Sequence, residues 1–391
     1  MERKEFIVKT GAMITAVALL SSFKGITGIS KQTKQNNMKN KRPSADDFSQ
    51  PIMKAISFGI NAPNPHNTQA WKMRITSDVE MLLYIDENRL LPATDPPTRQ
   101  IHIGSGCFIE TLRIGALGIG YETKITYFPE GPYELEDIGK KPVAQISLSR
   151  KENIEKSQLF PHIFTRQTNR KSYHGPMVTT KEFNHIMNLV SETHSEIITM
   201  NDYKKMQPFL DIFSNAMRIE ANTSKHLWEE TRIWMRWNKK DRLNNRDGLS
   251  VPQSGVDGLK KIILEGYLKN GDPKRWFSER VIESSLKAYT KGIKSSKGLV
   301  FFKTDSNTSL DWVKTGRDFA RFHLAATELN MYLHPYSQVL QEYEEMDKLN
   351  TKFNKLFNIS NGGKVQMAVR IGRGDKPYLS YRRNVKDYLK E

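Results

Sequence analysis

The feature that most constrains the fold is a segment rich in proline and asparagine, APNPHNTQAW, at residues 62–71. Its prolines and asparagines are incompatible with a regular helix or a central strand. Before it, the apolar residues of positions 51–60 recur at helical spacing. After it, residues 71–75 alternate between apolar and basic side chains, as a half-buried strand does. The sequence therefore predicts a rigid loop that connects a helix to a strand.

This loop carries three side-chain amides, those of Asn64, Asn67 and Gln69. Each amide both donates and accepts hydrogen bonds. Such a loop suits a planar heteroaromatic ligand whose edges mix donors and acceptors. The alternative is a polar connection in which Trp71 anchors the chain in the core.

A second informative segment, IFTRQTNRKSY, lies at residues 163–173. In an extended chain, Arg166, Thr168 and Arg170 point to one face. Two guanidinium groups and a hydroxyl suit a phosphate, because arginine binds its oxygens in bidentate fashion. The alternative is a basic loop on the surface.

Both segments resemble motifs of the nitroreductase superfamily. Residues 63–71 are similar to its flavin-contacting loop, PSxxNxQPW, with Asn64 in place of serine and Ala70 in place of proline. Residues 166–170 are similar to the R-x-S-x-R motif that binds the phosphate and ribityl chain of FMN, with Thr168 in place of serine. The resemblance implies FMN as the cofactor.

The order of the motifs indicates two nitroreductase-like units in tandem. The basic motif follows the amide loop by about 100 residues, and residues 113–121 parallel residues 322–332. This pattern resembles the Acg subgroup of the superfamily over residues 45–391. It implies an α+β fold in which each unit has a central, mostly antiparallel sheet flanked by helices. The two units would form a pseudo-dimer with one complete FMN site built from both.

The resemblance also assigns roles to the end of the chain. The segment 334–338 corresponds to the loop whose backbone approaches flavin N5, which makes Pro335, Tyr336 and Ser337 cofactor contacts. Arg382 and Arg383 correspond to the basic pair that reaches the FMN phosphate, and the sequence does not choose between them. The other predicted cofactor-binding residues are Asn64, Asn67, Gln69, Arg166, Thr168 and Arg170. No catalytic acid or base is predicted, because flavin chemistry does not require one from the protein.

We expect three parts along the chain: residues 1–44, residues 45–155 as the first unit, and residues 156–391 as the second. The second unit carries an insertion at about 202–300, where Trp228, Trp234 and Trp237 lie in a basic, helical run. By resemblance the insertion is a lid over the flavin. Packing of a core between helices is the alternative.

Residues 1–44 look like an export signal followed by a flexible tether. The start Arg3-Lys4 before an apolar run resembles a twin-arginine signal with lysine as its second basic residue, and a Sec signal or an uncleaved anchor is the alternative. The expected partner is the twin-arginine export machinery. The expected location is the periplasm or the membrane surface, or the cytoplasm if the leader is not functional.

Composition narrows the function classes. The net charge of +17 raises nucleic acid as a partner, but much of it lies in the first 42 residues and no zinc-binding spacing occurs. We therefore predict a solvated basic surface, no nucleic-acid partner and no metal site. A single cysteine, Cys107, excludes an intrachain disulfide.

These features favour an FMN-dependent oxidoreductase that passes hydride or electrons to a small acceptor. The sequence does not name the electron donor or the acceptor, and NAD(P)H is one candidate donor. The alternative is a protein that sequesters FMN behind its lid without turnover. The oligomeric state is left open, since a single chain can act as a pseudo-dimer.

Overall fold

The computed structural model describes residues 42–223, 230, 232–268, 272–359 and 362–390. It contains two four-stranded sheets in which all neighbouring strands are antiparallel. The first sheet has the order β1-β2-β4-β3, with β1 (Trp71–Ser77), β2 (Glu80–Ile85), β3 (Tyr121–Tyr127) and β4 (Ala144–Arg150). The second has the order β5-β6-β8-β7, with β5 (Glu196–Met200), β6 (Gly298–Thr304), β7 (Tyr332–Pro335) and β8 (Lys364–Gly372). The predicted export signal lies outside the described residues.

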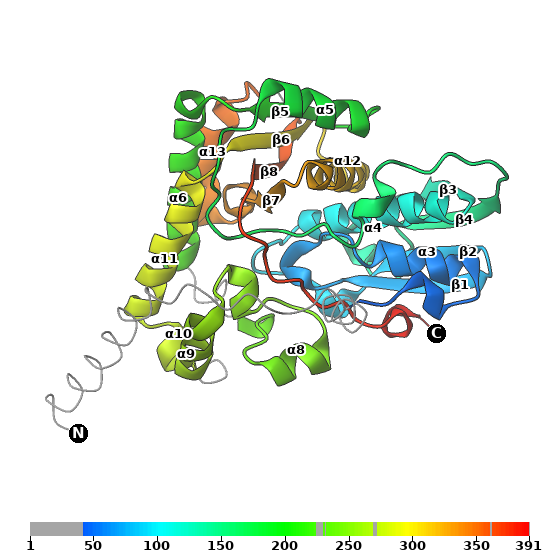
Figure 1. The fold of residues 1–391 in the computed structure, drawn as a ribbon, viewed down its shortest axis with the longest axis horizontal. Helices are drawn as coiled ribbons and strands as arrows, with labels where there is room; N and C mark the ends of the chain where they lie inside the picture. Colours follow the sequence, from blue (N-terminus) through cyan, green and yellow to red (C-terminus); the bar gives the residue numbers. More distant parts are fainter. Residues whose placement is uncertain (1–41, 224–229, 231, 269–271, 360–361, 391) are drawn as a thin grey trace, which may run out of the picture.

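The two sheets repeat one topology (Figure 1). In the first half, α3 (Pro51–Gly59) precedes β1, and α4 (Arg99–Gly118) joins β2 to β3. In the second half, α5 (Thr180–Val190) precedes β5, and α12 (Ser309–Glu328) lies between β6 and β7. The structure thus confirms the predicted α+β class, with two similar antiparallel sheets flanked by helices.

The helix α4 begins at Arg99. Its first turn is stabilised by the Asp95 carboxylate, which accepts hydrogen bonds from the backbone N–H groups of Gln100 and Ile101, both at 3.0 Å. A carboxylate that satisfies unpaired N–H groups stabilises the first turn of a helix.

Arg99 is the first residue of α4. Its guanidinium group is 1% exposed and donates to the backbone oxygens of Gln366 (2.7 Å) and Leu340 (2.8 Å). Both acceptors belong to the second half of the chain. Arg99 therefore ties the first unit to the second.

The helices α4 and α12 cross between the two sheets with their backbones in contact (Figure 1). A Cβ atom built on Gly106 would lie 1.8 Å from the backbone oxygen of Val313, and one on Gly316 would lie 2.0 Å from that of Ile103. Only glycine allows two helices to approach this closely. The thiol of Cys107 donates to the backbone oxygen of Gly316 at 3.1 Å, as a buried structural cysteine.

The same crossing contains a buried ion-pair cluster. Glu110 of α4 is 0% exposed and pairs with Arg113 (2.6 Å) on its own helix and with Arg317 (2.7 Å) on α12. Burial alone raises the pKa of Glu110, but these guanidinium groups reverse that effect and lower it to about 2. A buried carboxylate needs such partners to stay charged.

The insertion between β5 and β6 is helical. It contains α6 (Tyr203–Thr223), α8 (Lys239–Asn245), α9 (Gly258–Leu268), α10 (Pro273–Trp276) and α11 (Glu279–Lys294). Around α8 to α10 it has a small core of its own, formed by Met235, Trp237, Val251 and Leu268. Trp228 lies outside the described residues. Within the described part of the chain, no helix combines the length and apolar character needed to cross a membrane.

After β8 the chain leaves the second unit, and we call residues 373–390 the C-terminal segment. It runs back across the molecule to the first sheet, as the red trace in Figure 1 shows. There Leu389 forms a parallel bridge with Met73, and the backbone N–H of Lys390 donates to the oxygen of Met73 at 2.8 Å. The end of the chain therefore brings second-half residues to the amide loop of the first half.

Candidate functional site

The amide loop between α3 and β1 is held in an unusual backbone conformation. His66, Asn67 and Gln69 all have positive φ angles, between 45° and 54°. Such angles cost on the order of 1 kcal/mol or more for a residue with a Cβ atom and persist where surrounding contacts impose them. Inside the loop, the side-chain oxygen of Asn64 accepts from the backbone N–H of Gln69 at 2.9 Å.

The side chain of Asn67 joins three segments of the chain. Its oxygen accepts from Nη1 of Arg382 at 2.8 Å, and its nitrogen donates to the backbone oxygen of Gly248 at 3.1 Å. Asn67 therefore links the amide loop to the C-terminal segment and to the insertion.

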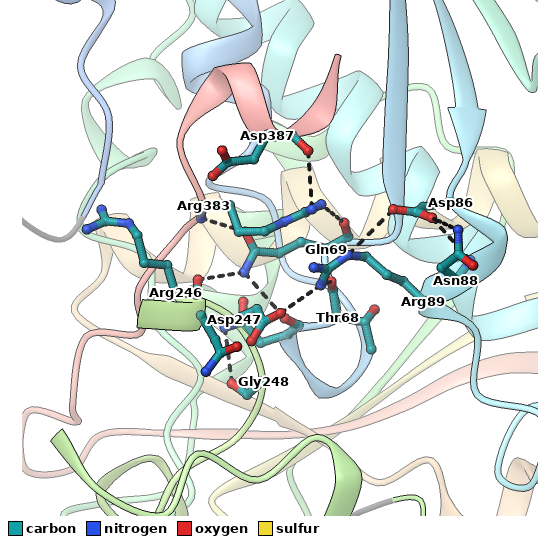
Figure 2. A network of polar contacts seen from close by, with 12 residues as sticks. Thr68, Gln69, Asp86, Asn88, Arg89, Arg246, Asp247, Gly248, Arg383 and Asp387 are labelled. Carbon is teal, nitrogen blue, oxygen red and sulfur yellow. Dashed lines mark hydrogen bonds and ion pairs between the residues drawn. The ribbon is translucent and has the colours of Figure 1, made fainter. Parts of the chain in front are cut away.

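Gln69, two positions further on, makes the same connection (Figure 2). Its side-chain nitrogen donates to the backbone oxygen of Arg246 at 3.0 Å. Its side-chain oxygen accepts from the backbone N–H of Arg383 at 3.0 Å and from the hydroxyl of Tyr388. The polar atoms of this amide are thus engaged by the protein itself.

The predicted basic segment approaches the same place from the second half. Arg166 is 3% exposed and donates to the backbone oxygen of Asn61 at 3.1 Å. Thr168 forms a parallel bridge with Leu333 of β7. Arg170 donates to the backbone oxygen of Gln253, in the insertion, at 3.5 Å.

These segments line a partly open cavity of about 60 Å³. Six of the predicted residues line it: Asn64, Asn67, Arg166, Thr168, Arg170 and Arg382. The further lining residues are Arg42, Pro63, Gln167, Leu249, Gln253, Tyr378 and Ser380. Residues from both halves, the insertion and the C-terminal segment thus share one cavity.

The cavity is strongly electropositive. Four arginines line it, and its described lining includes no Asp or Glu. Burial, together with the guanidinium groups of Arg382 and Arg166, lowers the pKa of Arg42 well below its ordinary value. Burial and the charge of Arg382 lower the pKa of Arg166 to about 9, and burial lowers that of Arg382 to about 10. Clustered cations in a low-dielectric site favour an anion as their partner.

The two candidate arginines of the C-terminal pair have different surroundings. Arg382 lines the cavity and donates to the backbone oxygens of Ile60 (2.6 Å) and Ala62 (3.1 Å). Arg383 points elsewhere: it donates to the backbone oxygen of Gln69 at 2.7 Å, and its guanidinium carbon lies 4.2 Å from the ring centre of Tyr388. The structure therefore distinguishes two residues that the sequence did not.

Five of the predicted residues, Gln69, Arg383, Pro335, Tyr336 and Ser337, are not among those that line the cavity. The segment 334–338 is also less irregular than a loop, because β7 ends only at Pro335. The ring of Tyr336 is 1% exposed and packs against Phe213, with ring centres 5.0 Å apart.

The insertion is fastened over the cavity by a buried carboxylate. Asp247 pairs with Arg89 of the first unit and with Arg236 of the insertion, both at 2.7 Å, as Figure 2 shows in part. Next to it, the backbone N–H of Gly248 donates to the oxygen of Asn67 at 3.0 Å. Gly248 has a φ of 69°, and a Cβ atom there would lie 2.2 Å from the backbone oxygen of Trp234.

A second carboxylate anchors the start of the same segment. Glu230 is 6% exposed and accepts from the backbone N–H groups of Ala93 (2.9 Å) and Thr94 (3.1 Å). We call Glu230 and residues 232–255 the lid, because Leu249 and Gln253 within it form part of the cavity wall.

Among the residues that sequence reasoning missed, two are important for this arrangement: Arg42 and Asp247. Arg42 falls in the segment predicted to be a tether, and a polar low-complexity stretch gives no sign of a buried side chain. Asp247 carried no functional prediction. The glycine after it was the one available signal in the sequence, because glycine often marks a close approach between backbones.

The fold and the site define an α+β protein with two antiparallel sheets and an arginine-lined cavity enclosed by both halves. No family model matches the chain. The chain is 23% identical over 185 residues to the Mycobacterium tuberculosis protein named "Putative NAD(P)H nitroreductase acg", which covers 47% of this chain and 50% of that protein. It is 27% identical over 131 residues to the uncharacterized protein Rv3127 of the same organism, covering 32% and 36%. The matched stretch thus spans at most half the length of these curated relatives.

Solved structures give weaker matches. The FMN-dependent nitroreductase NfnB from Mycobacterium smegmatis, in complex with NADPH, matches with a TM-score of 0.36 and 11% identity over 59% of this chain and 96% of that chain. A nitroreductase-like family protein from Bacillus cereus matches with a TM-score of 0.33 and 10% identity over 61% and 97%.

Proposed function

We propose that this chain binds FMN and acts as a nitroreductase-like oxidoreductase on a small-molecule acceptor. The observation that carries the proposal is the cavity in which buried arginines from both halves of the chain converge without a carboxylate in its described lining. When bound, FMN supplies the hydride or electron transfer. The protein's part is to bind, orient and shield it.

The donors around the cavity fit the phosphate end of FMN. Arg166 and Arg382 present guanidinium groups, and Thr168 adds a hydroxyl. Gln167 contributes an acceptor: its side-chain oxygen is buried and has no hydrogen-bond partner within the described chain. A ribityl hydroxyl is a donor of the kind that this oxygen lacks.

The size of the cavity sets a condition on this proposal. Cofactor pockets usually measure roughly 300–1,000 Å³. The 60 Å³ available in this cavity accommodates a phosphate group, but not a flavin ring. We therefore propose that the lid, which supplies Leu249 and Gln253 to the wall, is displaced when FMN enters.

The same lid supports a second candidate function, in which the protein sequesters FMN without turnover. Asp247 and Glu230 both fasten the lid to the first unit through buried contacts. A lid that closes again over the flavin would exclude NAD(P)H and the acceptor.

An absorption spectrum of the purified protein with added FMN, repeated anaerobically after addition of NADPH, tests both candidates. A flavin band that bleaches is the result expected for the oxidoreductase. A bound flavin that NADPH does not reduce would favour sequestration. Failure to bind FMN at all would overturn both.

A further inference from the structure

Arg42 is the first residue that the structure describes, and it reaches into the cavity from the N-terminal side. Its side chain is 5% exposed. Nη1 donates to the side-chain oxygen of Asn61 at 3.1 Å, and Nε donates to the backbone oxygen of Ser380 at 3.3 Å. We call residues 42–48 the N-terminal arm. Arg42 thus fastens the arm to the end of α3 and to the C-terminal segment.

Three guanidinium groups meet around Asn61. Arg42 contacts its side-chain oxygen, while Arg166 (3.1 Å) and Arg382 (3.5 Å) both donate to its backbone oxygen. Arg42 and Arg382 also share the hydroxyl of Ser380, at 3.5 Å and 2.7 Å. Residues separated by more than a hundred positions in sequence therefore place their charges side by side.

The partners of these three arginines in the described chain are neutral oxygens and nitrogens. Buried like charges repel one another, and neutral acceptors do not compensate that repulsion. Burial lowers the pKa values of all three side chains, and the charges of neighbouring arginines lower those of Arg42 and Arg166 further. A tetrahedral dianion offers several acceptor oxygens and two negative charges to such a cluster. The cavity of about 60 Å³ has room for one phosphate group.

We infer that Arg42 is a phosphate-binding residue of this cavity, and that a bound phosphate monoester docks the N-terminal arm onto the folded protein. This inference rests on the proposed function, because it adds a residue to the phosphate end of the proposed FMN site. Ligand binding and arm docking are then reciprocal, so each strengthens the other by the same factor.

The docked arm has local structure that reports on this coupling. Ser44 caps the short helix η2 (Ala45–Asp47), and the backbone N–H groups of Asp47 and Phe48 donate to the oxygens of Ser44 (3.2 Å) and Ala45 (3.3 Å). Hydrogen exchange at Asp47 and Phe48 therefore measures whether the arm is ordered. In the full-length wild-type protein, inorganic phosphate is expected to slow this exchange. Unchanged exchange at saturating phosphate would overturn the coupling.

The role of Arg42 is tested by comparing FMN with riboflavin, which lacks the phosphate. Titrations use the full-length wild-type protein, Arg42→Gln, Arg42→Lys and, as a matched control, Arg74→Gln at an exposed position of β1. Loss of a charge-assisted contact to phosphate predicts about 10- to 100-fold weaker FMN binding by Arg42→Gln. Riboflavin affinity should stay unchanged, Arg42→Lys should lie between, and the control should match the wild type. Equal FMN affinity in wild type and Arg42→Gln would refute the assignment.

The outcomes separate this inference from the proposed function. If no flavin binds, but phosphate raises the melting temperature of the wild type and not of Arg42→Gln, the anion site stands and the flavin function fails. If FMN and riboflavin bind equally and phosphate has no effect, the flavin function stands and this inference fails. If Arg42→Gln does not fold, the role of Arg42 is tested by measuring how strongly phosphate competes with FMN for Arg42→Lys. Weaker competition than in the wild type is expected, and equal competition would overturn the role of the guanidinium group.

Discussion

Replacing Asp247 with asparagine should release the lid. Asp247 is the buried carboxylate between Arg89 and Arg236, with N···O distances of 2.7 Å to each. Its side chain is 4% exposed, and those of the two arginines are 20% and 14% exposed. Asparagine keeps the shape and one acceptor. It leaves Arg236 without a counter-charge in the described chain, and it leaves Arg89 with only its longer pair to Asp86 at 3.5 Å.

The magnitude follows from these exposures. Breaking a fully buried ion pair by removing one partner costs about 3–5 kcal/mol. Here water screens both arginines in part, so we expect about 2–3 kcal/mol. Asp247 and its partners are solvated when the lid is open, so the loss falls on the closed state. The lid-opening equilibrium constant should therefore rise about 30- to 150-fold.

Hydrogen exchange at Gly248 and Leu249 measures lid opening without any ligand. Their backbone N–H groups donate to the oxygens of Asn67 (3.0 Å) and Trp234 (2.8 Å), and the first of these bonds breaks when the lid leaves the amide loop. Under native conditions, exchange of Gly248 in Asp247→Asn should accelerate by the same factor as the opening constant.

A matched control is Asp257→Asn, also in the insertion. Asp257 pairs with Lys171 at 2.6 Å, but its side chain is 73% exposed. Surface pairs contribute about 0–1 kcal/mol, so Gly248 should exchange at nearly the wild-type rate. The role of Asp247 in holding the lid closed is refuted if Asp247→Asn leaves the hydrogen exchange of Gly248 unchanged, or if both variants accelerate it equally.

Three further changes test the helix crossing and the site. Burial raises the pKa of Glu110, but the neighbouring guanidinium groups lower it to about 2, below its ordinary value of 4.5. Its ionised form therefore stabilises the folded protein by about 3 kcal/mol above pH 4.5. That contribution is lost as the pH falls from 4.5 toward 2. Urea unfolding of Glu110→Gln should therefore show lower stability at pH 7 and a flatter acid limb, and an unchanged acid limb would contradict this. Gly106→Ala should lower the melting temperature by the equivalent of about 3 kcal/mol or more, because its Cβ atom would overlap the backbone of α12. The control Gly266→Ala has open space around its Cβ atom and should be neutral or stabilising. Similar shifts in both variants would contradict the close crossing of α4 and α12. Isothermal titration with FMN should show about 10- to 100-fold weaker binding for Arg382→Gln, while Arg383→Gln should mainly lower thermal stability, and the reverse pattern would exchange their roles.

Much of the fold could be predicted from the sequence because its elements have clear local periodicity. The strands at Trp71–Ser77 and Ala144–Arg150 bury alternate side chains, and this alternation is visible in the sequence as apolar residues at every second position. Other elements lack this alternation, so the sequence gives no comparable signal for them. β5 has only partly buried side chains after its first residue, and β7 is four residues long.

The candidate site was predictable where one motif supplies the residues. Arg166, Thr168 and Arg170 lie within five positions, and the structure brings all three to one cavity. The choice between Arg382 and Arg383 was not predictable. Adjacent residues of one type are equivalent in sequence, and only the packing of the C-terminal segment against Gln69 and Tyr388 separates them.

The sequence by itself determined the local elements, the tandem arrangement and the chemistry of the two motifs, since these depend on residues close together in the chain. Only the tertiary structure decided which charges meet. Arg42 joins the site because the N-terminal arm and the C-terminal segment both pack on Asn61. Asp247 holds the lid to the first unit because Arg89, far away in the sequence, lies beside it. Contacts between distant segments depend on how whole sheets and helices pack, and no local pattern records that packing.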